Sequence, residues 1–119
     1  MMIEILKPDF SFEDNRGKLF QLMHGGCNQV NYVESKADVI RGGHYHKLNR
    51  EIFYVIEGEF DVTAKRGNES ETKSFSSGDF FAIDKGIFHS FYYKKDTKLI
   101  VAYDVGVESD NGEKDIYTE

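Results

Sequence analysis

This chain of 119 residues contains one cysteine, one proline and no tryptophan. The single cysteine, Cys27, excludes an internal disulfide and is typical of a protein in a reducing compartment. No segment approaches the roughly 18 consecutive apolar residues of a membrane-spanning helix. The basic and apolar segments of a signal peptide are absent from the N-terminus. We therefore expect a cytoplasmic protein with no membrane partner.

Positive charge is also scarce, because 15 Lys and Arg residues stand against 21 Asp and Glu, for a net charge of −6. Nucleic-acid affinity rests largely on clustered basic side chains, so we expect no nucleic-acid partner. Much of the acidity lies in residues 105–119, which we expect to form a partly mobile acidic tail. The length suits one domain with its own core, and we expect a single domain over residues 1–119.

Short segments separated by turn residues make up most of the chain. Phe60, Val62 and Ala64 alternate with polar residues, which is the period of a half-buried strand. No long window repeats apolar residues at the 3.6-residue spacing of a helix. Short strands between regular turns predict an all-β sandwich or barrel. The expected strands include residues 17–23, 29–34, 37–41, 60–64, 80–83, 87–93 and 99–103.

The strand near Glu51 carries apolar residues on both of its faces. If Glu51 points into the barrel, the other odd-numbered residues of the strand do so too. Ile52, Tyr54 and Ile56 then form an apolar outer face, which predicts burial against another subunit. We therefore expect a homodimer. The alternative is that the chain's own N-terminal segment covers this face.

Three of the four histidines, together with one glutamate, have the composition of a metal site. His44 and His46 are two positions apart on an expected strand, so they project from the same face. Glu51 follows after a turn, and His89 comes from a distant strand. Imidazole and carboxylate ligands suit a divalent transition metal such as Zn, Fe, Mn or Ni. We expect these four residues to bind one metal, with a metal-free acid–base site as the alternative.

The spacing of these residues resembles the two motifs of the cupin superfamily. The first motif is carried by His44, His46, Glu51 and Gly58, and the second by residues 78–89. The resemblance implies a small double-stranded β-helix (jelly-roll) barrel of the RmlC-like kind, with the site at its mouth. The chain departs from the usual pattern at Asp38 and Asp84, where the superfamily usually has glycine and proline.

Two further segments resemble cupins that act on nucleotide sugars. Residues 14–19 are similar to a segment near the start of such cupins. Residues 41–47 (Arg-Gly-Gly-His-Tyr-His-Lys) resemble the dTDP-sugar 3,4-ketoisomerases, and equally the metal-binding cupin domain of capsular UDP-sugar epimerase/reductases. The ketoisomerases tend to carry Gln in place of Glu51 and work without metal. Glu51 therefore resembles the metal-bearing relative, whereas Lys47 and the short length resemble the ketoisomerases, so both alternatives stay open.

These resemblances imply an enzyme of polysaccharide biosynthesis, a sugar-nucleotide ketoisomerase or epimerase. Its substrate would be a dTDP- or UDP-linked keto-deoxyhexose, from which it removes a proton next to the ketone. In a metal-free site His44 or His46 would be the base. With a metal bound by these ligands, Tyr32 or Tyr103 would move the proton.

Three basic side chains are candidates for contact with the phosphate groups of such a substrate. Arg41 is the first choice because its planar guanidinium suits phosphate, and Lys47 and Arg16 follow. Two other functions stay open. One is a metal-dependent cupin oxygenase or isomerase of a small metabolite, and the other is a non-catalytic ligand-binding cupin.

Overall fold

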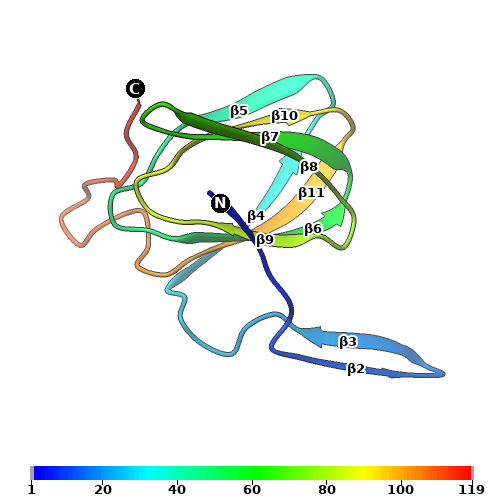
Figure 1. Cartoon of the computed structure of the whole chain (residues 1–119). Helices are drawn as coiled ribbons and strands as arrows, with labels where there is room; N and C mark the ends of the chain where they lie inside the picture. The colour runs from blue at the N-terminus through cyan, green and yellow to red at the C-terminus, as the bar shows by residue number, and fades with distance from the viewer. Residues whose placement is uncertain (1, 119) are drawn as a thin grey trace.

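The computed structural model describes residues 2–118, which form eleven β-strands and no helix (Figure 1). In chain order the strands are β1 (Ile3–Ile5), β2 (Phe10–Asp14), β3 (Gly17–Gln21), β4 (Gln29–Ser35), β5 (Val39–His44), β6 (Glu51–Glu57), β7 (Glu59–Arg66), β8 (Glu69–Ser76), β9 (Phe80–Ile83), β10 (Phe88–Tyr93) and β11 (Thr97–Tyr103). The expected all-β class is confirmed. Within the described residues, no helix is long and apolar enough to cross a membrane.

Two antiparallel sheets form the walls of a barrel (Figure 1). The five-stranded sheet has the order β1-β9-β6-β11-β4, and the four-stranded sheet has the order β5-β10-β7-β8. Neighbouring strands are mostly distant in the sequence, as in a jelly roll. This topology places the end of β5, the start of β6 and the start of β10 close together.

The core between the sheets is built largely from aromatic rings. Phe60 and Phe81 are fully buried. Phe75 stacks on Phe81 with ring centroids 3.9 Å apart, and Phe91 stacks on Phe60 at 5.5 Å. Full burial of a phenylalanine side chain stabilises a fold by about 1.5–3 kcal/mol. Phe91 thereby anchors β10, the strand that also carries His89.

Strand β6 alternates as expected, because Glu51 and Phe53 are buried whereas Ile56 is 43% exposed on the outer face. The N-terminal strand β1 pairs with β9 at the edge of the same sheet. It therefore lengthens the sheet and does not cover the outer face of β6. Residues 5–8 and Phe20 nevertheless line one cleft with Tyr54, so the N-terminal segment lies beside part of this face and leaves Ile56 exposed.

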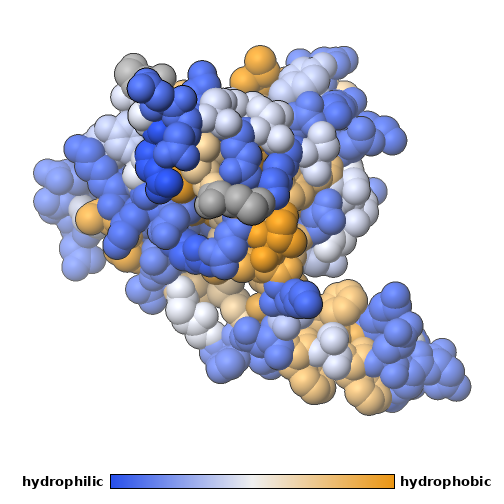
Figure 2. All heavy atoms as spheres, in the orientation of Figure 1, coloured by the Kyte–Doolittle hydropathy of each residue, from blue (hydrophilic) through white to orange (hydrophobic). Residues whose placement is uncertain are grey.

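Strands β2 and β3 pair with each other and form an arm that projects from the barrel (Figure 1). We call residues 10–21 the β2–β3 arm. Its apolar side chains Phe10, Phe12, Leu19 and Phe20 are between 47% and 55% exposed. In Figure 2 these apolar residues colour the middle of the arm, and charged residues mark its tip. The sequence analysis expected β3 but missed β1, β2 and the projection of the arm.

The chain after β11 returns to the barrel. The backbone N–H of Tyr45 donates to the carbonyl of Tyr117 at 2.8 Å, and the reverse hydrogen bond is 3.0 Å long. Asp115 is only 5% exposed. Part of the expected acidic tail therefore packs beside the His44-Tyr45-His46 segment. The expected mobility stays a prediction for the exposed residues between Glu108 and Lys114.

Candidate functional site

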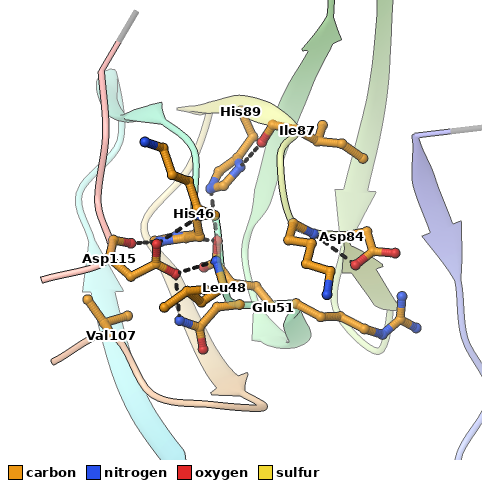
Figure 3. A network of polar contacts seen from close by, with 12 residues as sticks. His46, Leu48, Glu51, Asp84, Ile87, His89, Val107 and Asp115 are labelled. Atoms are coloured by element: carbon orange, nitrogen blue, oxygen red, sulfur yellow. Dashed lines mark hydrogen bonds and ion pairs between the residues drawn. The ribbon is translucent and has the colours of Figure 1, made fainter. Parts of the chain in front are cut away.

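The four expected ligands His44, His46, Glu51 and His89 form one cluster. Figure 3 shows three of them, His46, Glu51 and His89, close to one another. His44 ends β5, Glu51 begins β6, and His89 lies opposite His44 in the pairing of β10 with β5. Their ligand atoms lie within 4.8 Å of one another. His46, Glu51 and His89 are each at most 4% exposed, and His44 is half-buried. The structure therefore brings together all four residues.

Two glycines permit close backbone approaches, Gly42 beside this site and Gly58 at the other end of β6 from Glu51. Gly42 has a φ of +92°, and a Cβ there would lie 2.9 Å from the carbonyl oxygen of His89. Gly58 has a φ of +120°, and a Cβ there would lie 2.2 Å from Oγ1 of Thr97. Because other residues strongly disfavour these backbone angles, glycine is required at both positions.

Asp38 replaces the usual glycine of the first motif and still adopts its left-handed conformation, with a φ of +64°. Aspartate tolerates this region better than most residues do. Its N–H donates to the carbonyl of Tyr93 at 2.7 Å, and the hydroxyl of Tyr92 donates to its carboxylate at 3.2 Å. The substitution therefore preserves the backbone path that leads into β5.

Asp84, at the usual proline position of the second motif, lies in a turn beside the site (Figure 3). Its carboxylate accepts a hydrogen bond from the N–H of Lys85 at 2.8 Å. The N–H of Gly86 donates to the carbonyl of His46 at 2.7 Å. The second motif thus closes onto the first, although proline is missing.

Backbone carbonyl groups orient the rings of His46 and His89 (Figure 3). Nδ1 of His46 donates to the carbonyl of Asp115 at 2.5 Å, and Nδ1 of His89 donates to that of Ile87 at 3.0 Å. A carbonyl oxygen only accepts, so each Nδ1 carries a hydrogen, and Nε2 of the neutral ring carries the lone pair. The two Nε2 atoms lie 2.7 Å and 2.9 Å from the same oxygen of Glu51.

Nε2 of His46 and Oε1 of Glu51 are buried without a hydrogen-bond partner among the described residues. They are 2.7 Å apart, but their geometry is not that of a hydrogen bond. Buried polar atoms without a partner are rare, and a lone pair that faces a carboxylate is repelled by it. A cation removes this repulsion, either a proton on the imidazole or a metal ion: burial lowers the pKa of His46, but the contacts with Glu51 outweigh it and raise the pKa. Histidine ligands of metals commonly donate their other N–H to a carbonyl, as both rings do here. The donor set therefore fits a divalent transition metal.

The surroundings of the site shift the pKa values of His44, Glu51 and Tyr103. Burial, together with the nearby His89 and His46, lowers the pKa of His44 to about 4. Burial opposes ionisation of Glu51, but the contacts with His46 and His89 outweigh it and lower the pKa of the carboxyl group. Burial and the nearby Glu51 raise the pKa of Tyr103 above its usual range.

A pocket of about 120 Å³ opens beside these residues. Its polar lining consists of Arg41, His44, Glu51, His89, Tyr93 and Tyr103. His46 lies behind this surface, with 4% of its area exposed. The structure therefore distinguishes the two histidines of the first motif, since His44 faces the pocket and His46 does not.

Three expected site residues lie elsewhere. Tyr32 is 56% exposed on the outer face of β4, because Val33, its neighbour in the strand, is the one that lines the pocket. Arg16 lies at the tip of the β2–β3 arm and pairs there with an aspartate at 2.7 Å. Nζ of Lys47 lies 4.1 Å from the centre of the Tyr117 ring. None of the three contributes to the pocket within one chain, whereas Arg41 does.

Asp115, which was not predicted as a site residue, holds the turn after His46. Its carboxylate accepts hydrogen bonds from the backbone N–H groups of Lys47 at 2.8 Å and Leu48 at 2.9 Å, and from the side chain of Asn49 at 2.8 Å. These groups lie 66 to 68 residues away in the chain. One acid in an acidic tail carries no local signal of such contacts.

The barrel, with three histidines and a glutamate at one end, has the cupin fold that the resemblance implied. Residues 12–103 match the family described as the polysaccharide biosynthesis C-terminal domain. This match covers more than half of the chain, and the chain belongs to this family.

Solved structures of two sugar ketoisomerases and of one capsular polysaccharide assembling protein share this fold. A 3,4-ketoisomerase from Helicobacter canadensis matches with a TM-score of 0.81 and 20% identity, over 100% of this chain and 92% of that one. The sugar 3,4-ketoisomerase QdtA from Thermoanaerobacterium thermosaccharolyticum, solved in complex with TDP, matches with a TM-score of 0.77 and 16% identity. The match covers 98% of this chain and 86% of QdtA. The capsular polysaccharide assembling protein CapF from Staphylococcus aureus matches with a TM-score of 0.64 and 21% identity, over 92% of this chain and 33% of CapF. Because the sequence identities are low, these three matches show a shared fold and do not by themselves show a shared function.

A curated protein matches a shorter segment. Quercetin 2,3-dioxygenase from Aspergillus japonicus is 37% identical over 49 residues, which make up 40% of this chain and 14% of the dioxygenase. The chain therefore spans a small fraction of that enzyme, and the match does not carry the enzyme's activity to this protein.

Proposed function

We propose that this protein is a metal-dependent isomerase or epimerase of a keto-deoxyhexose linked to dTDP or UDP. One observation supports the metal. His46 and His89 each donate from Nδ1 to a backbone carbonyl, and both direct Nε2 at the same oxygen of Glu51. The substrate class is supported by the polysaccharide biosynthesis family and by neighbours described as ketoisomerases, one of them in complex with TDP.

In this proposal His46, Glu51 and His89 hold the divalent metal, which would be Zn, Fe, Mn or Ni. When bound, the metal supplies positive charge that stabilises the negative oxygen formed next to the ketone. The sequence analysis included His44 among the ligands. We infer instead that His44 takes the proton, because its ring faces the pocket and its low pKa leaves it neutral and able to accept.

Two other side chains of the pocket complete the proposed mechanism. Tyr103 stays protonated because burial and Glu51 raise its pKa, so it suits the donation of a hydrogen bond or a proton to the substrate oxygen. Arg41 lines the pocket, and its guanidinium would contact the phosphate groups. Tyr32, Lys47 and Arg16 are not part of this set within one chain, because the fold places them away from the pocket.

The proposal is tested by the melting temperature of the purified protein with EDTA, with single divalent metals, and with dTDP or UDP. A ligand at 100 times its Kd stabilises a protein by about 2.7 kcal/mol. We expect stabilisation by at least one metal and by one nucleotide. If neither nucleotide changes the melting temperature at millimolar concentration, the proposed substrate class is wrong.

A second candidate is a metal-dependent oxygenase or isomerase of a small metabolite. The 49-residue similarity to a dioxygenase and the small pocket of about 120 Å³ favour it. It predicts the same metal binding and no effect of nucleotides. Oxygen consumption by the metal-loaded protein, measured with candidate metabolites, would distinguish it from the isomerase.

We also propose a homodimer formed through the outer face of the five-stranded sheet and the β2–β3 arm. The pairing of the strands places apolar side chains next to one another on this face: Val30, Tyr32, Ile52, Tyr54, Phe80 and Ile100. The base of the arm lies close to this face, because Phe20, Tyr54 and Phe80 line one cleft. An isolated two-stranded hairpin is marginally stable in water. A second copy of the chain would bury both surfaces.

Two further expectations remain proposals. The single cysteine, Cys27, supports a cytoplasmic location, because reducing compartments disfavour disulfides. The length of 119 residues supports one domain over residues 1–119. A thiol-specific mass label, applied to protein taken directly from cells, measures whether Cys27 is reduced. A reduced Cys27 would agree with the cytoplasmic location.

A further inference from the structure

The tail holds the turn that follows His46 by several hydrogen bonds (Figure 3). The carboxylate of Asp115 accepts from three N–H groups in residues 47–49, at 2.8 to 2.9 Å. The backbone carbonyl of the same aspartate accepts from Nδ1 of His46. One residue therefore holds both the imidazole ring and the backbone beside it.

A second set of contacts places the tail along the first motif. Tyr45 and Tyr117 exchange two backbone hydrogen bonds, and their rings lie 5.6 Å apart. The N–H of Asp115 donates to the carbonyl of Val107 at 2.7 Å, which closes the tail into a loop. The tail thus adds to the His44-Tyr45-His46 segment as a short strand would, through main-chain hydrogen bonds.

His46 and His89 differ in what orients them. The carbonyl that holds His89 belongs to Ile87, two residues away, next to the start of the same strand β10. The carbonyl that holds His46 belongs to a residue 69 positions away, in the tail. The ring of His89 therefore keeps its orientation without the tail, whereas that of His46 depends on it.

We propose that Asp115 is a positioning residue of the metal centre and that tail docking and metal binding stabilise each other. This inference rests on the proposed metal site. The docked tail keeps the hydrogen of His46 on Nδ1 and leaves Nε2 free to bind the metal. Loss of such a partner typically weakens metal binding by about 10- to 100-fold. Because coupling between two sites is reciprocal, a bound metal must also favour the docked tail.

The test compares full-length D115A with D110N, which removes the charge of an exposed acid in the same tail. The Kd for Co²⁺ is measured by calorimetry, and the visible absorption of bound Co²⁺ reports the ligand geometry. We expect D115A to bind Co²⁺ about 10- to 100-fold more weakly, with an altered spectrum, and D110N to match the wild type. D115N, which keeps the size of the side chain and one acceptor oxygen, should bind with intermediate affinity.

A second measurement needs no variant and remains valid if D115A does not fold. Hydrogen exchange of the Tyr45 and Tyr117 amides in the wild type is compared with and without Co²⁺, and slower exchange with metal is expected. If the wild type binds no metal, the proposed function fails. If it binds Co²⁺ while the exchange of these amides is unchanged, or while folded D115A has the same Kd and spectrum, only the role of the tail is wrong.

Discussion

Nε2 of His46 lies 2.7 Å from Oε1 of Glu51, and neither atom has a hydrogen-bond partner in the described part of the chain. The same carboxylate oxygen lies 2.9 Å from Nε2 of His89. When both rings are neutral with their hydrogen on Nδ1, two lone pairs face one anion. A glutamine at this position would offer an N–H to one of those lone pairs. In the proposed function, Glu51 therefore separates a metal-binding site from a metal-free one.

The variant E51Q should fold as the wild type does and lose its response to metal, because the amide satisfies a lone pair and removes the anionic ligand. EDTA should lower the melting temperature of the metal-loaded wild type by about 5–15 °C and leave that of E51Q unchanged. The control is E57Q, which changes an exposed glutamate paired with Lys98 on the same strand and should keep the EDTA effect. An equal EDTA effect in E51Q would contradict the metal role of Glu51.

Replacement of the two histidines of the first motif should separate catalysis from metal binding. H44N should retain the metal and lose about 10²- to 10⁴-fold in turnover, because the proposed base is removed. H46N, unlike H44N, should lose both turnover and the bound metal. Elemental analysis gives the metal content, and solvent deuterium incorporation into a dTDP-linked keto-deoxyhexose reports proton abstraction. Y32F, on the outer face, serves as the control and should behave as the wild type. Metal loss in H44N would instead make His44 a ligand.

Removal of the guanidinium of Arg41 should weaken nucleotide binding. A hydrogen bond to a charged group contributes about 1.5–3 kcal/mol, so R41A should raise the Kd for the preferred nucleotide by about 10- to 100-fold. K47A is the matched control, because Lys47 lies against Tyr117 and not in the pocket. Calorimetric titration measures both variants. A larger loss in K47A than in R41A would reverse the proposed assignment.

Charge placed on the apolar outer surfaces should dissociate the proposed dimer. F12K, on the β2–β3 arm, and Y54K, on the outer face of β6, each place a lysine where a second copy would be buried. We expect a monomer mass by light scattering for both variants and a dimer mass for the wild type. S70K, on the exposed β8 of the other sheet, should stay dimeric. A monomeric wild type would exclude this interface.

Much of the fold was predictable because its signals are local. The alternation along β6 correctly placed Glu51 inside and Ile56 outside, since side chains of a strand alternate with period two. The spacing of His44 and His46 indicated a shared site for the same reason. The β2–β3 arm was not predictable, because its strands alternate like barrel strands and only the full sheet topology shows that they leave the barrel.

The sequence by itself determined an all-β fold, because strand period depends on neighbouring residues. The resemblance to the two cupin motifs implied the barrel and grouped His44, His46, Glu51 and His89. Tertiary structure decided which histidine faces the pocket, that Tyr32 lies outside it, and that Asp115 holds His46. These outcomes depend on contacts between segments up to 69 residues apart. Such contacts form only when the two sheets and the returning tail pack together, so no local pattern encodes them.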